Sequence, residues 1–251
     1  MSESTATPAS LYPLDQSETE VQLFYTREIT EDGKVIDTIT HRLRRPTLPE
    51  LLERESQSVA EVEEVAPNED AWHEDSQAAN AKLWDKVCLG VKGYRLGGQL
   101  VTEMLPMTPK LAAIMPTAHK ATAIAGLYVA KCTVEGSVDE GFNLDGDTYT
   151  IRQELGAGET PQYVILHTLK QPTEGELREY NRRANTATSV TGSRKRKIRV
   201  RTNLKADVEL YDKLATAITG ATPGDPRMVD PIFKRQVVQT LIAKLNVSLS
   251  D

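Results

Sequence analysis

Two histidines occupy matching places in similar stretches of this 251-residue chain, and histidine is the side chain best suited to moving a proton near neutral pH. His41 begins the string His-Arg-Leu-Arg-Arg-Pro-Thr-Leu-Pro-Glu-Leu, and His167 begins His-Thr-Leu-Lys-Gln-Pro-Thr-Glu-Gly-Glu-Leu 126 positions later. Acid–base catalysis needs a partner group, but no Ser, Cys or carboxylate recurs beside the two histidines. We therefore predict that both imidazoles lie at a core edge and hydrogen-bond a backbone carbonyl.

Metal and cofactor chemistry has little support in the remaining reactive residues. His73 and His119 lack companions at ligand spacing, and Cys88 and Cys132 lie in apolar stretches that predict buried thiols in a reducing compartment. The acidic, glycine-containing segment 139–146 lacks the spacing of an EF-hand loop. We expect no metal, no cofactor and no enzymatic activity, because no nucleophile–base set or phosphate loop is present.

Two strongly charged segments of opposite sign are the most unusual feature of the composition. A basic segment carries six positive charges within eight positions: Arg194, Lys195, Arg196, Lys197, Arg199 and Arg201. The corresponding segment of the first similar stretch is acidic: Glu61, Glu63, Glu64, Glu69, Asp70, Glu74 and Asp75. Both segments are expected to form the loop between the first and the second helix of a copy.

Three interpretations of these segments remain open. They could be solvated loops, the basic one could contact nucleic-acid phosphates, or the two could make a charge-complementary contact between halves or between neighbouring molecules. The net charge of −6 does not suit a general nucleic-acid coat. We favour the third interpretation, because opposite ends of one subunit support head-to-tail rings or lattices.

A second repeated block indicates that the chain is a tandem duplication. Leu83-Trp84-Asp85-Lys86 returns as Leu210-Tyr211-Asp212-Lys213, so the interval from histidine to aromatic residue is 43 positions in one copy and 44 in the other. Two blocks recurring with almost the same gap indicate copies of one unit. Adjacent Asp and Lys residues on a helix do not face each other, so we expect each to pair with another element.

Each copy is expected to begin with a β-hairpin. Alternating apolar and polar residues predict strands over 21–29 and 35–43, joined by a turn at Asp32-Gly33, and over 149–155 and 163–169. The alternation places each histidine on the apolar face of its strand.

A capped helix follows each hairpin. Thr47 and Thr173 are predicted N-caps, and Glu50 and Glu176 stand three residues later, where each completes a capping box. We expect a further helix from about 76, with Gly90 and Val91 on its buried side, and another from about 204. Closing helices are expected over 116–127 and 231–245, and short strands over 131–134 and 245–249. The first copy has about a dozen extra residues in 95–115, which suit a partner-specific loop.

The predicted fold class is α+β, with two tandem related domains, each a β-hairpin followed by about three helices. We expect a flexible N-terminal arm at 1–19, a first domain at 20–136, a linker at 137–147 and a second domain at 148–251. No apolar run reaches the roughly 18 residues that span a bilayer, and the N-terminus does not look like a secretory signal.

The two repeated blocks resemble small proteins encoded among the structural genes of tailed bacteriophages. This resemblance implies a virion component or an assembly factor of the head or tail, located in the virion or the host cytoplasm. We expect partners among other copies of the chain and neighbouring virion proteins, and no membrane. The alternatives are an assembly chaperone that leaves before completion and a nucleic-acid-binding module that uses 194–201.

Overall fold

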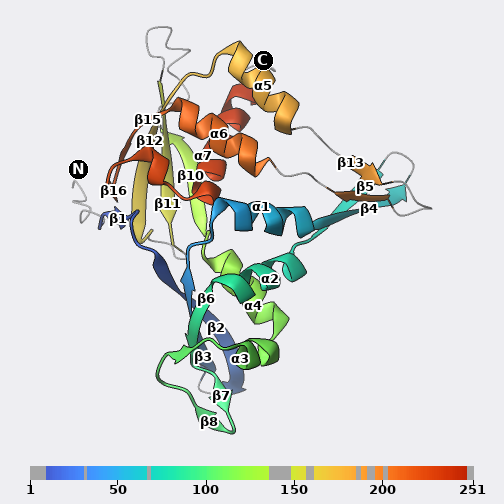
Figure 1. Ribbon diagram of the computed structural model, residues 1–251, viewed down its shortest axis with the longest axis vertical. Helices are drawn as coiled ribbons and strands as arrows, with labels where there is room; N and C mark the ends of the chain where they lie inside the picture. Colours follow the sequence, from blue (N-terminus) through green and yellow to red (C-terminus); the bar gives the residue numbers. More distant parts are fainter. Residues whose placement is uncertain are drawn as a thin grey trace. The chain divides into compact units, whose positions relative to one another are not determined.

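The computed structural model describes residues 10–30, 33–66, 69–135, 148–156, 161–184, 188–190, 196–199 and 203–247. The chain divides into two compact units. The N-terminal unit comprises Ser17–Leu127 and Ala187–Thr202, and the C-terminal unit comprises Met1–Gln16, Tyr128–Thr186 and Asn203–Asp251. Both contain helices and antiparallel strands, which confirms a mixed helix-and-strand fold of the predicted α+β kind (Figure 1).

The N-terminal unit is built on a four-stranded antiparallel sheet in the order β2-β3-β6-β9. Its strands are Glu18–Thr30 (β2), Gly33–Arg44 (β3), Cys88–Lys92 (β6) and Leu105–Pro106 (β9). Its helices are Leu48–Gln57 (α1), Gln77–Val87 (α2), Pro109–Ile114 (α3) and Thr117–Gly126 (α4). Helices α2 and α4 pack against each other and contact the β2–β3 hairpin.

The C-terminal unit contains a second antiparallel sheet, in the order β10-β11-β12-β15. Its strands are Ala130–Glu135 (β10), Thr148–Leu155 (β11), Tyr163–Lys170 (β12) and Ala215–Thr219 (β15). Its helices are Glu174–Ala184 (α5), Leu204–Leu214 (α6) and Pro231–Val247 (α7), with a short 3-10 turn at Pro226–Met228. Helix α7 contacts β10 and β11, and α6 contacts α7 and β12 (Figure 1).

The alternation of buried and exposed residues along a strand shows which face of each main sheet lies against the core. Along β12, Ile165, His167 and Leu169 are buried while the intervening residues are more exposed. Along β3, Ile39, His41 and Leu43 are likewise buried, and Thr40 between them is buried as well. The core of the C-terminal unit then closes on apolar residues of its helices, among them Val237, Val238 and Leu241. The expected position of both histidines on the apolar strand face is confirmed.

Both hairpins and most helices agree with the sequence-based expectations, but three assignments were wrong. Cys88–Lys92 forms β6 beside β3, although Gly90 and Val91 were assigned to the helix before it. Leu245–Val247 continues α7 instead of forming a strand. Part of the expected flexible arm is structured, since Tyr12–Pro13 (β1) pairs in parallel with Ala221–Thr222 (β16) and Leu14 is buried.

The two compact units do not follow the predicted domain bounds. Strand β10 falls in the predicted first domain, 20–136, but it pairs with β11. The segment 187–202 falls in the predicted second domain, yet it belongs to the N-terminal unit. The predicted linker and the acidic segment 139–146 lie outside the described residues.

A third four-stranded sheet in the N-terminal unit combines the two charged segments. Its order is β13-β14-β4-β5, and its strands are Thr188–Val190 (β13), Arg196–Arg199 (β14), Val59–Ala66 (β4) and Glu69–Asp75 (β5). We call β4–β5 the acidic hairpin and β13–β14 the basic hairpin. Nothing in the separation of these segments along the chain predicts that they share a sheet.

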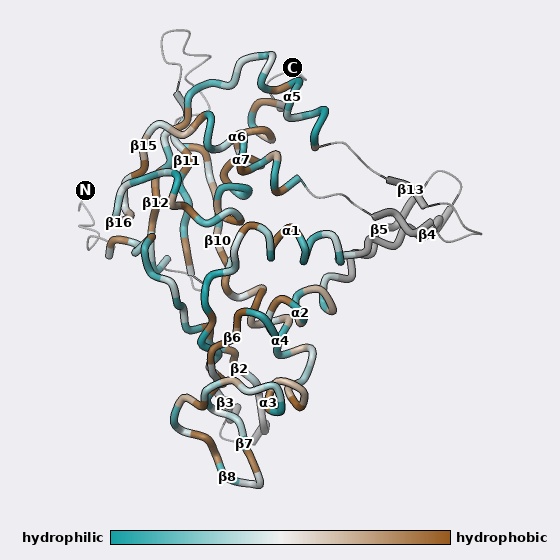
Figure 2. The backbone as a smooth tube through the Cα atoms, in the orientation of Figure 1, coloured by the Kyte–Doolittle hydropathy of each residue, from teal (hydrophilic) through white to brown (hydrophobic). Residues whose placement is uncertain are grey.

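The predicted insertion at 95–115 contains a small hairpin, Arg95–Leu96 (β7) with Gln99–Leu100 (β8), followed by β9 and α3. Leu96 and Leu100 are exposed, and the hairpin is marked by hydrophobic residues (Figure 2). Among the described helices, none combines the length and the apolar character that a membrane span requires.

Candidate functional site

Within each unit, the block that begins with histidine contacts the block that contains the aromatic residue. In the N-terminal unit the indole Nε1 of Trp84 donates a hydrogen bond of 2.9 Å to Nδ1 of His41. In the C-terminal unit the hydroxyl of Tyr211 lies 2.8 Å from Nδ1 of His167. The intervals of 43 and 44 positions therefore separate the partners of a buried hydrogen bond that joins a sheet to a helix.

Each imidazole uses its other nitrogen as well. Nε2 of His41 lies 3.0 Å from the Tyr94 hydroxyl, which lies 3.1 Å from Nδ1 of His119. Nε2 of His167 lies 3.2 Å from Oε1 of Gln153, which is an acceptor. The prediction of a carbonyl partner was wrong, because side chains from neighbouring elements fill both positions.

These contacts define one tautomer for both histidines. Nδ1 must accept from Trp84 or Tyr211, so the proton of a neutral ring lies on Nε2. Burial lowers the pKa of His167 to about 4. Burial, and secondarily the nearby His119, lower the pKa of His41 to about 4. Both rings are neutral near pH 7 and act as rigid connectors in the core.

A lysine from the closing helix covers each aromatic residue. Nζ of Lys120 lies 5.1 Å from the centre of the Trp84 ring and 2.6 Å from Oδ1 of Asp85. Nζ of Lys234 lies 5.4 Å from the Tyr211 ring and 2.5 Å from Oδ1 of Asp212. Both lysines are buried, and a buried ammonium requires a carboxylate partner of this kind.

The Asp-Lys pairs of the repeated block therefore do bind other elements, as expected, and their partners lie on other helices. Each aspartate pairs with the closing helix, α4 or α7. Lys86 pairs with Glu53 of α1 at 2.6 Å, and Lys213 pairs with Glu179 of α5 at 3.1 Å. These exposed pairs contribute little to stability individually.

The predicted capping residues begin α1 and α5. The Glu50 carboxylate accepts hydrogen bonds from the backbone N–H and hydroxyl of Thr47, both at 2.9 Å. Glu176 does the same for Thr173, whose hydroxyl also accepts from the Glu176 backbone N–H at 3.2 Å. Arg44 holds Glu50 in a two-point ion pair, and this contact, with the cap, lowers the pKa of Glu50 to about 2.

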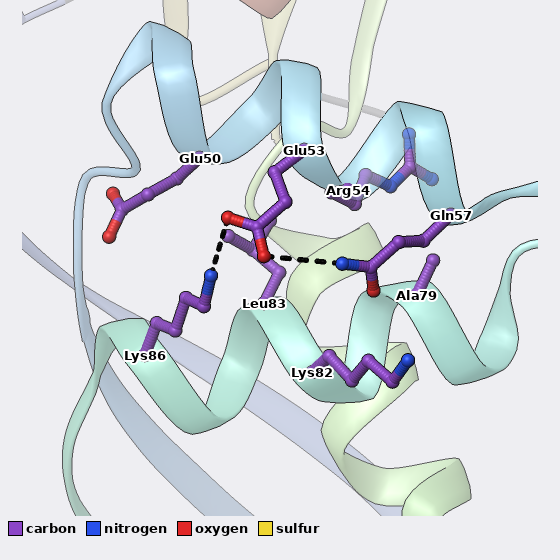
Figure 3. Close-up of a pocket in the computed structure, with 8 residues that line it drawn as sticks. All are labelled: Glu50, Glu53, Arg54, Gln57, Ala79, Lys82, Leu83 and Lys86. Carbon is purple, nitrogen blue, oxygen red and sulfur yellow. Dashed lines mark hydrogen bonds and ion pairs between the residues drawn. The ribbon is translucent and has the colours of Figure 1, made fainter.

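Shallow grooves lie beside these caps, one in each unit. Figure 3 shows the groove between α1 and α2, where Glu53 lies between Lys86 and Gln57. The second groove lies between α5 and α6, and its lining residues match the first with shifts of 126 positions in the first helix and 127 in the second. The grooves are open to solvent, and their free space of about 180 and 220 Å³ includes part of that solvent. Both are smaller and more charged than the usual small-molecule site.

The expectation that the two charged segments are loops was wrong, because their described parts form strands that lie side by side. Strand β14 lies antiparallel to β4, with Lys197 opposite Glu61 and Arg196 opposite Val62. The structure thus brings together part of the predicted basic segment and part of the predicted acidic one, in the same chain. Arg194, Lys195 and Arg201 lie outside the described residues.

Of the two thiols that were predicted to be buried, Cys88 is buried and Cys132 is half-buried. Burial raises the pKa of the Cys88 thiol to about 12 and that of Cys132 to about 11, so neither thiol is a ready nucleophile. In the part of the chain that the structure describes, no three His, Cys, Asp or Glu side chains gather as they would around a metal ion.

Sequence reasoning missed several residues that complete these centres. No sequence motif marks Tyr94, His119 or Gln153. The two lysines are far along the chain from the aspartates that they bind, at 35 positions for Lys120 and 22 for Lys234. The repeated interval between histidine and aromatic residue was a usable signal, because a preserved interval between two blocks suggests that the blocks touch.

Comparison of the chain with protein-family models, with curated proteins and with solved structures finds no match.

Proposed function

We propose that this chain is a non-enzymatic assembly protein built from two diverged copies of one α+β unit. The observation that carries the proposal is the sheet in which the basic hairpin pairs with the acidic hairpin. Oppositely charged hairpins are suited to joining polypeptides with a defined partner and orientation. The buried histidines and lysines, in contrast, serve the core of each unit.

Matched contacts support the duplication. The bond between histidine and aromatic residue, the lysine over the aromatic ring, the capping carboxylate and the groove lining each occur once per unit at equivalent sequence positions. So many equivalent contacts are explained by the copying of one unit and not by two independent origins. Both copies contain the contacts that build the fold. The charged hairpin is acidic in the first copy and basic in the second.

We further propose that the assembly is a tailed-bacteriophage particle, in which the chain is a minor or decorating subunit of the head or tail. The support is the resemblance of the repeated blocks to proteins encoded among phage structural genes. The test is mass spectrometry of purified particles from a phage that encodes the chain. A virion subunit is present at a constant number of copies per particle. Its absence from intact particles would contradict this placement.

Two alternatives give different results in the same preparation. An assembly chaperone is present in infected cells and bound to unassembled head or tail proteins, but it is missing from finished particles. A nucleic-acid-binding module binds DNA or RNA with an affinity that falls steeply as salt rises. The pairing of β14 with the acidic β4 disfavours this second alternative, because acidic residues beside a basic strand weaken its attraction for phosphates.

A further inference from the structure

The sheet formed by the two charged hairpins ends at strands that have one neighbour each among the described residues. Strand β5 pairs with β4, and β13 pairs with β14. An edge strand presents backbone N–H and C=O groups that can pair with a further strand. The sheet therefore offers two places at which another polypeptide could extend it.

The pairing of the two hairpins within the chain indicates which strand could pair with each open edge. Strand β14, the second strand of the basic hairpin, lies antiparallel to β4, the first strand of the acidic hairpin. The open edges are the second strand of the acidic hairpin, β5, and the first strand of the basic hairpin, β13. A β5–β13 contact would again join a second strand to a first strand, and it would keep the antiparallel alternation of the sheet.

Charge also favours this contact over pairing of like edges. Residues 59–75 contain seven acidic residues and no Lys or Arg, whereas 188–199 contain five basic residues and no acidic one. Two β5 strands side by side would oppose like charges, which destabilises a sheet. The basic hairpin of a second molecule is complementary to the acidic edge, just as the basic hairpin of the same chain is complementary to β4.

We propose that β5 of one copy pairs with β13 of another copy, so that the sheet continues from molecule to molecule. This inference rests on the proposed assembly function and deepens it, because it names a second copy of the chain as the partner. The two edges differ, so the contact is head-to-tail and generates a ring or a filament.

The first test is the mass of the full chain by sedimentation velocity over a wide range of concentration, at low and high salt. We expect mass to rise with concentration and to fall with salt. Proline substitutions then block one edge at a time, because proline lacks the N–H that an added strand would use. Ala71→Pro and Trp72→Pro act on β5, and Ser189→Pro and Val190→Pro act on β13. Successive residues point their N–H groups to opposite edges, so in each pair one substitution faces outward.

A mixture of two variants, each blocked at a different edge, gives the most decisive test of the β5–β13 contact. A variant blocked at β5 and a variant blocked at β13 should each be monomeric alone, yet together they should form a dimer and nothing larger. The free β13 of the first then pairs with the free β5 of the second. Thr102→Pro, in an exposed loop, is the control and should assemble like the parent chain. A mixture that stays monomeric, although the parent chain assembles, would overturn the proposal.

Charge reversal covers the case in which the prolines disturb the hairpins themselves, which protease resistance would reveal. Asp70→Lys with Glu74→Lys should raise the concentration needed for association about tenfold, a change of about 1.4 kcal/mol. The charge-matched control, Asp15→Lys with Glu103→Lys at exposed sites, should change it little. Equal effects of the two pairs would overturn the proposal, and so would a parent chain that is monomeric throughout. A monomer that is still found in purified particles would leave the proposed function standing.

Discussion

At the scale of single residues, the two histidines connect the sheet of each unit to neighbouring elements through hydrogen bonds. Each ring is buried, neutral near pH 7 and bonded at both nitrogens to side chains of other elements. A buried imidazole without its donor would lose a hydrogen bond that water cannot replace. The aromatic residue must therefore carry an N–H or O–H, which both Trp84 and Tyr211 provide.

Removing that donor should destabilise the unit that contains it. Tyr211→Phe keeps the ring but leaves Nδ1 of His167 without a donor, so we expect a loss of about 1 to 3 kcal/mol in the free energy of unfolding. Urea titration followed by circular dichroism measures the change. Tyr149→Phe is the control, because Tyr149 is a half-buried tyrosine that belongs to neither histidine centre. Equal losses in the two variants would contradict the assigned role of the bond.

Stability should fall as the pH drops from about 6.5 to about 4. The pKa of His41 and of His167 is about 4 in the folded state, below the value near 6.5 of an unfolded histidine. The unfolded state therefore binds more protons in this window, and unfolding becomes easier as pH falls through it. We expect each histidine to contribute about 2 kcal/mol of destabilisation at pH 5 relative to pH 7.5. Urea titrations at both pH values measure this loss.

The control for the pH effect is a chain with His41→Gln and His167→Gln. This variant starts from a lower stability, but its stability should change less between pH 7.5 and pH 5. A pH dependence as steep as that of the parent chain would mean that other groups are responsible.

At the scale of elements, a glycine follows the equivalent strand of each unit, which is the strand that pairs with the second strand of the main hairpin. Gly93 follows β6 with φ of +88°, and Gly220 follows β15 with φ of +81°. A Cβ atom at either position would overlap a backbone carbonyl, that of Thr38 or that of Val164. The close approach of this turn to the neighbouring strand therefore requires glycine for both conformation and space.

Alanine at these glycines should be costly for two separable reasons. Gly93→Ala or Gly220→Ala should lower the free energy of unfolding by about 2 to 4 kcal/mol, through backbone strain and overpacking. Gly97→Ala is the matched control, because φ is +58° but no atom lies within 4 Å of the added Cβ. Its cost should be about 1 kcal/mol, from strain alone. Thermal and urea unfolding of the three variants measure the difference, and equal costs would exclude a steric contribution.

At the scale of the whole molecule, the decisive feature is the sheet that brings distant charged segments together. Lys197 lies opposite Glu61 in the β14–β4 ladder. Lys197→Glu or Glu61→Lys alone opposes like charges, and each should increase the rate of proteolysis within the hairpins. The double exchange restores opposite charges and should recover part of the protection, with a coupling of about 0.2 to 1 kcal/mol. Additive effects of the two single changes would argue against this register.

Reversal of the whole basic cluster should act on assembly. With Arg194, Lys195, Arg196 and Lys197 all changed to Glu, we expect weaker association and loss of the salt dependence that is expected of the parent chain. Light scattering at low and high salt measures both. A mass that is the same in the parent and the variant, at every salt concentration, would remove charge from the account of assembly.

Local patterns were sufficient to predict much of this fold. Alternation predicted both main hairpins, and Pro-Thr-x-x-Glu-Leu predicted the starts of α1 and α5, because strand faces and helix caps depend on residues a few positions apart. Strands β6 and β15 were missed, since a short apolar run after a helix becomes a strand only when a sheet edge is available to pair with it.

The sequence by itself determined the repeated blocks, the local elements and the opposite charges of the two hairpins. Only the tertiary structure decided which side chains complete the histidine centres, and that β14 lies beside β4. The physical reason is the range of the interactions. Caps and alternation act between neighbours along the chain, whereas Tyr94, Gln153 and the strands of the charged sheet meet their partners only after the elements between them have folded and packed.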